Sequence, residues 1–138
     1  MVSQRRIETD GAPAAIGPYS QGIEAGEFVF AAGQIGLDPA SGELLGDFEA
    51  QVDRALDNLG AILAAAGLGF GDVVKTTCFL VDLADFAAFN ARYGARFPEP
   101  APARSTFAVA ALPRGARVEI EAVAFRARLA DAVAREVG

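Results

Sequence analysis

The sequence predicts one small domain that combines β-strands with two α-helices. Its 138 residues are enough for a single hydrophobic core and too few for two. Apolar side chains recur at helical spacing over residues 48–66 and again over residues 86–97. Shorter segments around these stretches alternate apolar and polar residues or are rich in β-branched residues, which is typical of strands. We therefore expect both kinds of element in one domain.

The N-terminal third is expected to contain strands joined by ordered loops. Two prolines and Gly17 between residues 13 and 20 predict a loop that ends near Tyr19. Gly26 and the residue after it form a candidate tight turn between two strands. A second turn-rich loop covers residues 36–42. The strands expected in this region are residues 5–9, 22–25 and 28–34.

The first helix is predicted to start after Asp47 and to stop at Gly67. The aspartate is a favourable N-cap, because its carboxylate accepts hydrogen bonds from free amides of the first turn. Glycine commonly ends a helix. A strand rich in β-branched residues is expected next, over residues 73–81. The apolar positions of the helix are Phe48, Val52, Leu56, Leu59, Leu63 and Ala66.

A second helix is predicted to start near Asp82, with Asp85 as an approximate capping partner, and to end before Pro98. Its apolar stripe contains Phe86, Phe89, Tyr93 and Phe97. Asn90 lies in the middle of that stripe, and a buried amide needs hydrogen-bond partners. Two compatible interpretations follow: the amide holds the backbone of a nearby loop, or it orders a loop beside a ligand pocket.

Arg104 lies in a candidate strand that two prolines, Pro100 and Pro102, introduce. Side chains alternate between the faces of a strand, so Arg104 and Thr106 share one face. The other face receives Ser105, Phe107 and Val109. A guanidinium held in this way can bind a carboxylate through two parallel hydrogen bonds. The alternative is a solvated edge arginine or a structural ion pair.

A last strand is expected over residues 117–126. One face carries Val118, Ile120, Ala122 and Ala124, and the other carries Glu119, Glu121, Val123 and Phe125. Partial burial would raise the pKa of either glutamate towards use as a general acid or base. The alternative is a polar stripe at a subunit interface or rim. Residues 129–138 then form a tail with a thin apolar line, which either docks as a helix or frays.

The composition excludes several classes of function. The chain has no histidine, which removes histidine-based nucleophilic sites and the commonest zinc ligand, so we expect no metal. The net charge is −6 and basic residues are scattered, which argues against nucleic acid. No apolar run approaches the roughly 20 residues of a membrane helix. The single cysteine, Cys78, forms no internal disulfide and fits a cytoplasmic location. Apolar residues make up 52% of the chain, so self-association is expected.

Several segments together resemble the RidA family, also called YjgF, in the order in which that family has them. The matching segments are residues 12–22, 32–35, 65–68, 71–77, 82–86, 89–93, 102–105 and 118–122. The resemblance implies a RidA-like single domain over residues 1–128, with residues 129–138 outside it. The implied fold is α+β and chorismate-mutase-like, with a mixed sheet and two helices on one face. Three subunits would form a barrel-like homotrimer with a ligand pocket at each interface.

The resemblance also implies an activity and a setting. Family members with the pocket arginine hydrolyse reactive 2-enamine and 2-imino acids, such as 2-iminobutanoate and 2-iminopropanoate, to 2-oxo acids and ammonia. This is metabolite damage control, because pyridoxal-phosphate-dependent dehydratases release these intermediates. No stable complex with the dehydratase and no cofactor is implied.

The family's site residues match this chain one by one. Arg104 matches the arginine that binds the substrate carboxylate, and Tyr19 matches the tyrosine that closes over the ligand. Asn90 matches the family's asparagine. Glu119 matches the glutamate that positions or activates water, and Gly33 matches a glycine beside the ligand.

Two positions depart from the best-known family pattern. Ala32 replaces a serine and so removes a hydroxyl donor, and Thr106 replaces a cysteine whose backbone contacts the ligand. Ala32 gives weight to a second reading, a non-catalytic protein that binds a 2-oxo acid or similar metabolite. Family membership also implies a third, an aminomuconate-type deaminase. A ribonuclease, reported for some relatives, is disfavoured by the acidic charge and the absent histidine.

Overall fold

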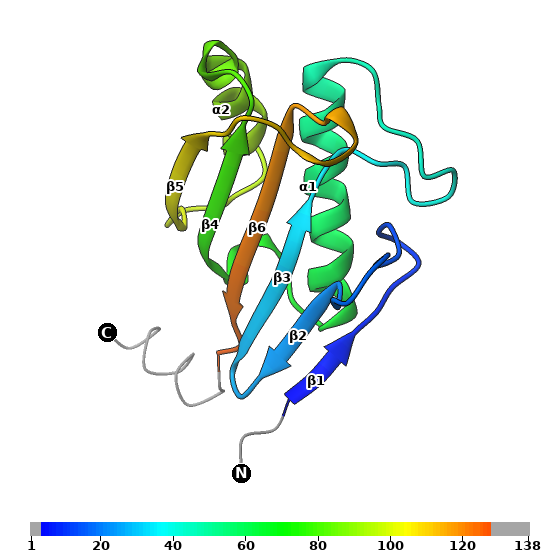
Figure 1. Ribbon diagram of the computed structural model, residues 1–138. Coiled ribbons are helices and arrows are strands. Elements are labelled where there is room, and N and C mark those ends of the chain that lie inside the picture. Colours follow the sequence, from blue (N-terminus) through cyan, green and yellow to red (C-terminus); the bar gives the residue numbers. More distant parts are fainter. Residues whose placement is uncertain (1–3, 128–138) are drawn as a thin grey trace.

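A mixed six-stranded sheet forms the framework of the computed structural model, which describes residues 4–127. The strand order is β1-β2-β3-β6-β4-β5, and only β4 and β5 pair in parallel (Figure 1). The expected tail at 129–138 lies outside the described residues. The strands are β1 (Gln4–Ile7), β2 (Gly22–Ala25), β3 (Phe28–Gln34), β4 (Val73–Leu80), β5 (Ala103–Ala108) and β6 (Val118–Phe125).

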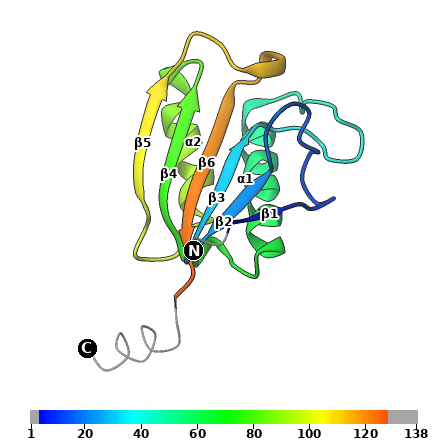
Figure 2. The same cartoon turned by 60° about the horizontal axis from the view of Figure 1, so that its bottom comes forward.

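Two helices, α1 (Phe48–Ala65) and α2 (Phe86–Gly94), cover one face of the sheet (Figures 1 and 2). The core lies between the helices and this face. It contains Val52, Leu56, Leu59 and Leu63 of α1 together with Val29, Cys78, Leu80, Val118 and Ile120 of the strands. The expected α+β fold with a mixed sheet and two helices on one face is therefore confirmed.

The opposite face of the sheet is open and carries phenylalanine side chains. Phe28, Phe30 and Phe107 are 43%, 47% and 52% exposed. The Phe28 ring lies 5.3 Å from that of Phe125, and the Phe107 ring lies 6.5 Å from that of Phe79. Exposed aromatic side chains gathered on one open sheet face often mark an interaction site.

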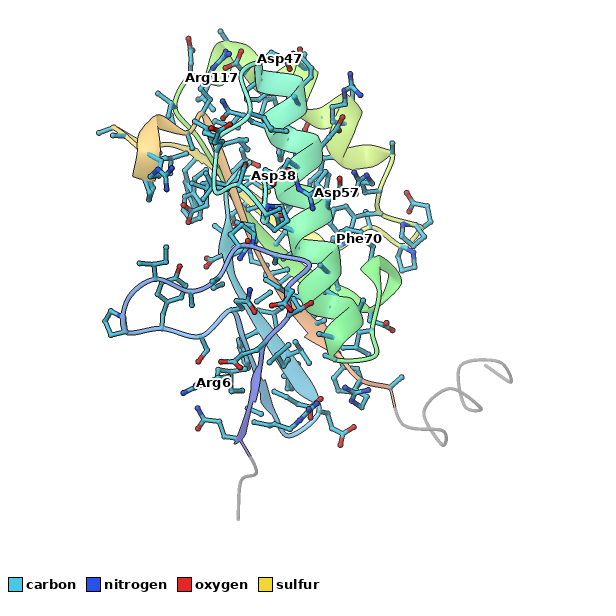
Figure 3. All side chains as sticks on the ribbon, turned by 90° about the vertical axis from the view of Figure 1, so that its right-hand side faces the viewer. Arg6, Asp38, Asp47, Asp57, Phe70 and Arg117 are labelled. Atoms are coloured by element: carbon cyan, nitrogen blue, oxygen red, sulfur yellow. The ribbon has the colours of Figure 1, made fainter. Side chains whose placement is uncertain are left out.

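The local signals around α1 are confirmed. The Asp47 carboxylate accepts a hydrogen bond of 2.7 Å from the backbone amide of Ala50, and this aspartate marks the start of the helix in Figure 3. Gly67 has a φ of +76°, a conformation that suits glycine and ends the helix. The predicted apolar positions of the helix are all buried.

The second helix is shorter than the sequence predicts. The Asp82 carboxylate caps only a single 3₁₀ turn, η2 (Leu83–Asp85), by accepting from the Ala84 amide at 2.9 Å. The α-helix begins afterwards at Phe86, and Asp85 makes no side-chain capping bond. It ends at Gly94, before Pro98 as predicted.

The strand predictions differ from the structure only at their ends. The predicted strands 22–25 and 28–34 coincide with β2 and β3, and Gly26 has a φ of +60° in the turn between them. The first strand starts and ends earlier than predicted, and β4 and β6 are slightly shorter. No helix between residues 4 and 127 has the length and apolar character needed to cross a membrane.

Candidate functional site

The first half of the candidate site lies beside the edge strand β5. We call it the Arg104 pocket: a hollow of about 410 Å³ that is lined by Leu83, Phe86, Arg104 and Thr106. Arg104 pairs with Thr76 of β4, whose own partner on β6 is Ala122. Since Thr76 and Ala122 are buried beneath the helices, the Arg104 side chain lies on the helix-covered face.

The Arg104 guanidinium is held by α2. Its Nη1 donates a 2.8 Å hydrogen bond to Oδ1 of Asn90. Its Cζ lies 4.9 Å from the ring centroid of Tyr93, with the rings of Phe86 and Phe89 at 5.5 and 5.7 Å. Among residues 4–127, no carboxylate forms an ion pair with Arg104. The cation therefore keeps hydrogen-bond donors for an external anion.

The role expected of Asn90 needs a correction. The sequence suggests that its amide holds or orders a loop, but its side chain accepts from Arg104 instead. Asn90 and Arg104 face each other because α2 packs over β4 and β5 on the helix-covered face. An amide oxygen is a neutral acceptor, so it orients the guanidinium and leaves its charge available for a ligand.

Thr106 shares the Arg104 pocket and has an unused hydroxyl. Its Oγ1 is buried, and within the described part of the chain it has no hydrogen-bond partner. Thr106 lies two residues along β5 from Arg104 and on the same face, as the sequence predicts. A buried hydroxyl without a partner beside an available guanidinium is suited to donate to the same anion.

The second half of the site surrounds Glu119. We call it the Glu119 pocket: a cavity of about 300 Å³ in which Tyr19, Gly33 and Glu119 meet. Glu119 is half-buried on the open face of β6. Burial raises the pKa of its carboxyl above the usual 4.5, and the charge of Glu121 adds to the effect. The sequence prediction that this strand carries a carboxyl with a raised pKa is supported for Glu119.

A β-bulge brings Gly33 against Glu119. Ala31 pairs with Ala122 and Gln34 pairs with Ile120, so two residues of β3 stand opposite Glu121 alone. A Cβ atom built on Gly33 would lie 2.9 Å from Cδ of Glu119 and closer still to its Oε2. Only glycine leaves room for this carboxylate.

Gly33→Ala is expected to destabilise the fold by about 1–3 kcal/mol, because the new methyl group displaces the Glu119 carboxylate. Thermal unfolding measures the effect. Gly46→Ala is the matched control, since its added Cβ would meet no atom within 4 Å. Equal melting temperatures for the two variants would contradict the close contact between Gly33 and Glu119.

Buried amides position the loops around the Glu119 pocket. The Gln21 side chain accepts from the Thr9 amide and donates to the carbonyls of Thr9, Ala12 and Pro13, at 2.8 to 3.2 Å. These bonds fix the base of the loop between β1 and β2, to which Tyr19 belongs. The ribbon of this loop projects from the body of the molecule in Figure 3. Asn58 of α1 donates to the carbonyls of Ile35 and Leu37.

The two pockets are separate within one chain. Glu119 pairs with Phe79, and Phe79 pairs with Phe107, so these three side chains lie on one face of the sheet. Phe107 is three residues from Arg104 along β5, and side chains alternate between the faces, so Arg104 lies on the opposite face. The Glu119 side chain therefore lies on the open face and the Arg104 side chain on the helix-covered face. The structure brings together Tyr19, Gly33 and Glu119, and separately Asn90, Arg104 and Thr106, but not the two sets.

The sequence alone did not indicate three residues that hold the Tyr19 loop and the Arg104 guanidinium in place. Gln21 directly precedes β2 and Thr76 lies within β4; both are buried polar residues, and only their burial distinguishes them. Tyr93 was assigned to the apolar stripe of the second helix, although its ring contacts the guanidinium and its hydroxyl lies 2.6 Å from Oγ1 of Thr76. The hydroxyl on an otherwise phenylalanine-rich stripe was the available signal.

A comparison with protein families gives one match over most of the chain. A family model described as Endoribonuclease L-PSP matches residues 9–126. Among curated proteins, the 2-iminobutanoate/2-iminopropanoate deaminase of Escherichia coli (strain K12) is 50% identical over 125 residues, which are 88% of this chain and 98% of that protein. The mouse (Mus musculus) protein of the same name is 50% identical over 124 residues, 89% of this chain and 92% of that protein.

Solved structures include near neighbours of this fold. The structure described as E. coli TdcF with bound serine has a TM-score of 0.86 and 46% sequence identity, and the match covers 89% of this chain and 99% of that one. Similarity at this level extends over both pockets, since it spans nearly the whole described chain.

Proposed function

The chain belongs to the RidA family, to which the Endoribonuclease L-PSP model corresponds, and from this membership we propose that it hydrolyses 2-imino acids. The substrates are small reactive enamines and imines such as 2-iminobutanoate and 2-iminopropanoate, and the products are 2-oxo acids and ammonia. The observation that carries the proposal is Arg104, a half-buried cation held by a neutral amide and aromatic rings, with no carboxylate partner among the described residues.

The complete site requires two subunits in this proposal. Arg104 and Glu119 lie on opposite faces of one sheet, so one chain alone cannot present both to a small substrate. The exposed phenylalanines of the open face supply an apolar surface that a homotrimer would bury. A barrel-like trimer would then bring the Arg104 pocket of one subunit against the Glu119 pocket of its neighbour.

The reaction needs positioning and proton transfer. Arg104 binds the substrate carboxylate through two hydrogen bonds. The substrate imine is protonated on nitrogen, and its electrophilic carbon faces a water molecule that Glu119 holds. The water oxygen forms a bond to that carbon while its proton passes to the Glu119 carboxylate, which gives a carbinolamine. Glu119 returns the proton to the nitrogen, and the carbon–nitrogen bond breaks with its electron pair on nitrogen. Ammonia leaves while the hydroxyl gives its proton back to the Glu119 carboxylate, so that the C=O bond of the 2-oxo acid forms, and Glu119 then releases this proton to solvent or to the departing ammonia.

The remaining site residues hold the substrate. Asn90 orients the guanidinium, and the free Thr106 hydroxyl donates a further hydrogen bond to the carboxylate. Tyr19, which is 55% exposed on its projecting loop, closes over the ligand. Gly33 leaves the space that the Glu119 carboxylate occupies. No cofactor takes part in this scheme.

A coupled assay tests the activity. Threonine dehydratase generates 2-iminobutanoate in the presence of semicarbazide, which traps the imine before it hydrolyses. Added protein is expected to lower the rate of semicarbazone formation in proportion to its concentration and to speed the release of 2-oxobutanoate. Binding of 2-oxobutanoate without any faster loss of the imine would replace the enzyme by a non-catalytic metabolite-binding protein.

The proposal also specifies the source of the substrate and the physiological role of the reaction. Substrate comes from pyridoxal-phosphate-dependent dehydratases by diffusion, without a stable complex between the two enzymes. The role is to remove a reactive metabolite before it damages other proteins. A cytoplasmic location stays a prediction from the single cysteine.

A further inference from the structure

Two buried residues that share a hydroxyl–hydroxyl hydrogen bond, Thr76 and Tyr93, adjoin Arg104. Thr76 on β4 is the register partner of Arg104 on β5, and it is fully buried. Tyr93 on α2 packs over both: its hydroxyl lies 2.6 Å from Oγ1 of Thr76, and its ring centroid lies 4.9 Å from Cζ of Arg104. The tyrosine thus connects the sheet to the guanidinium.

We propose that Tyr93 and Thr76 are positioning residues, which fix the orientation of the Arg104 guanidinium for carboxylate binding. This inference rests on the proposed function of Arg104. The hydroxyl–hydroxyl bond holds the Tyr93 ring against rotation and sliding, and the ring face attracts the cation. Asn90 holds one edge of the guanidinium at 2.8 Å, so the ring and the amide together leave another edge for the ligand.

The hydrogen bond between Tyr93 and Thr76 is expected to stay formed at every pH at which the protein works. Burial raises the pKa of the Tyr93 hydroxyl above its usual 10, so the group stays protonated across the working pH range. The hydrogen bond to Thr76 therefore persists. The other partner of the Thr76 hydroxyl is the Cys78 thiol at 3.9 Å, a weak donor that cannot replace the phenol.

A phenylalanine at position 93 would fill the core equally well. The variant Tyr93→Phe therefore distinguishes a role of Tyr93 in core packing from a role in positioning Arg104. The Tyr93 ring already packs against Phe89 and Phe97, with centroids 5.4 and 4.4 Å away. Tyr93→Phe keeps these contacts and removes only the bond to Thr76. It also leaves the Thr76 hydroxyl buried without a good partner, which destabilises the fold.

The double variant Tyr93→Phe/Thr76→Val provides the decisive comparison. Replacing both partners by apolar groups of the same shape restores much of the lost stability, because no orphan hydroxyl remains. The double variant still lacks the hydrogen bond that holds the ring at position 93 in place beside the Arg104 guanidinium. We expect the melting temperature to recover towards that of the wild type, while KM for 2-iminobutanoate and Kd for 2-oxobutanoate stay raised by about three- to tenfold. We expect kcat to change by less than about twofold, since Glu119 is untouched.

Phe97→Leu is the matched control. It loosens the same aromatic cluster and lowers the melting temperature, but its side chain makes no ring contact with Arg104. Its KM and Kd should remain those of the wild type. Nitrogen-detected NMR adds a readout that needs no ligand. Rotation of the Arg104 guanidinium about its Nε–Cζ bond should be faster in Tyr93→Phe than in the wild type. The Arg104 signal is assigned by its absence from the spectrum of Arg104→Ala.

The outcomes separate the two proposals. A wild-type protein without imine hydrolysis contradicts the proposed function, while the NMR and 2-oxobutanoate measurements still report on Tyr93. Wild-type KM, Kd and guanidinium rotation in the double variant would overturn the positioning role. An equal rise in KM for Phe97→Leu would reduce that role to general packing.

Discussion

Arg104→Ala is expected to lower kcat/KM for 2-iminobutanoate by about 10²- to 10⁴-fold. The variant loses two charge-assisted hydrogen bonds to the substrate carboxylate, each worth about 1.5–3 kcal/mol. Binding of 2-oxobutanoate should weaken in parallel, because the product carries the same carboxylate. Removing the side chain should also cost some stability, because the bond to Asn90 and the contacts with three aromatic rings are lost, so thermal unfolding is measured beside the rates. The semicarbazide assay and calorimetry measure the two losses.

Arg104→Lys separates charge from geometry. A lysine keeps the positive charge but lacks the planar arrangement that binds both Asn90 and a carboxylate. We expect it to remain at least about tenfold below the wild type in kcat/KM. Arg92→Ala is the control, because Arg92 lies on the same helix as Asn90 but pairs with Asp53 on the surface at 3.2 Å. Imine hydrolysis at a near-normal rate in Arg104→Ala would reject the assignment of the carboxylate-binding residue.

The elements of this fold were predictable because their signals are local. Asp47 and Gly67 delimit α1 through capping and a positive φ, both of which depend on single residues. The alternation that placed Arg104 and Thr106 on one face of β5 follows from strand geometry alone. The start of α2 was harder to predict, since a 3₁₀ turn and an α-helix share the same capping residue types.

The construction of the two pockets was not predictable from periodicity. The bulge beside Gly33 depends on register between β3 and β6, which the sequence of neither strand specifies alone. The contact between Asn90 and Arg104 depends on how α2 packs over β5. Strand alternation indicates that Arg104 can bind a carboxylate and the family resemblance supports it, but the hydrogen bond between the two side chains is seen only in the structure. The Thr76–Tyr93 bond was missed for the same reason.

Glu119→Gln is expected to lower kcat by about 10²- to 10⁴-fold, the usual contribution of a general base. Glutamine keeps the size of the side chain but cannot take a proton from water. Because burial raises the pKa of Glu119 above 4.5, wild-type kcat/KM should fall as the pH drops through that raised value. The variant should lack this acidic limb, while any titration of the imine itself remains in both profiles. Glu121→Gln, an exposed carboxylate on the same face of β6, should retain the limb and most of the activity.

The same raised pKa predicts that the variant is no less stable than the wild type. A carboxyl whose pKa is higher in the folded state binds its proton more tightly there, so ionisation opposes folding. This cost is absent below the ordinary value of 4.5, develops between 4.5 and the raised value, and is complete above it. Glu119→Gln should therefore match the wild-type melting temperature at about pH 4 and equal or exceed it at about pH 7. A rate loss with a lower melting temperature at neutral pH would instead make Glu119 a structural residue, and the water-activating role would then fall.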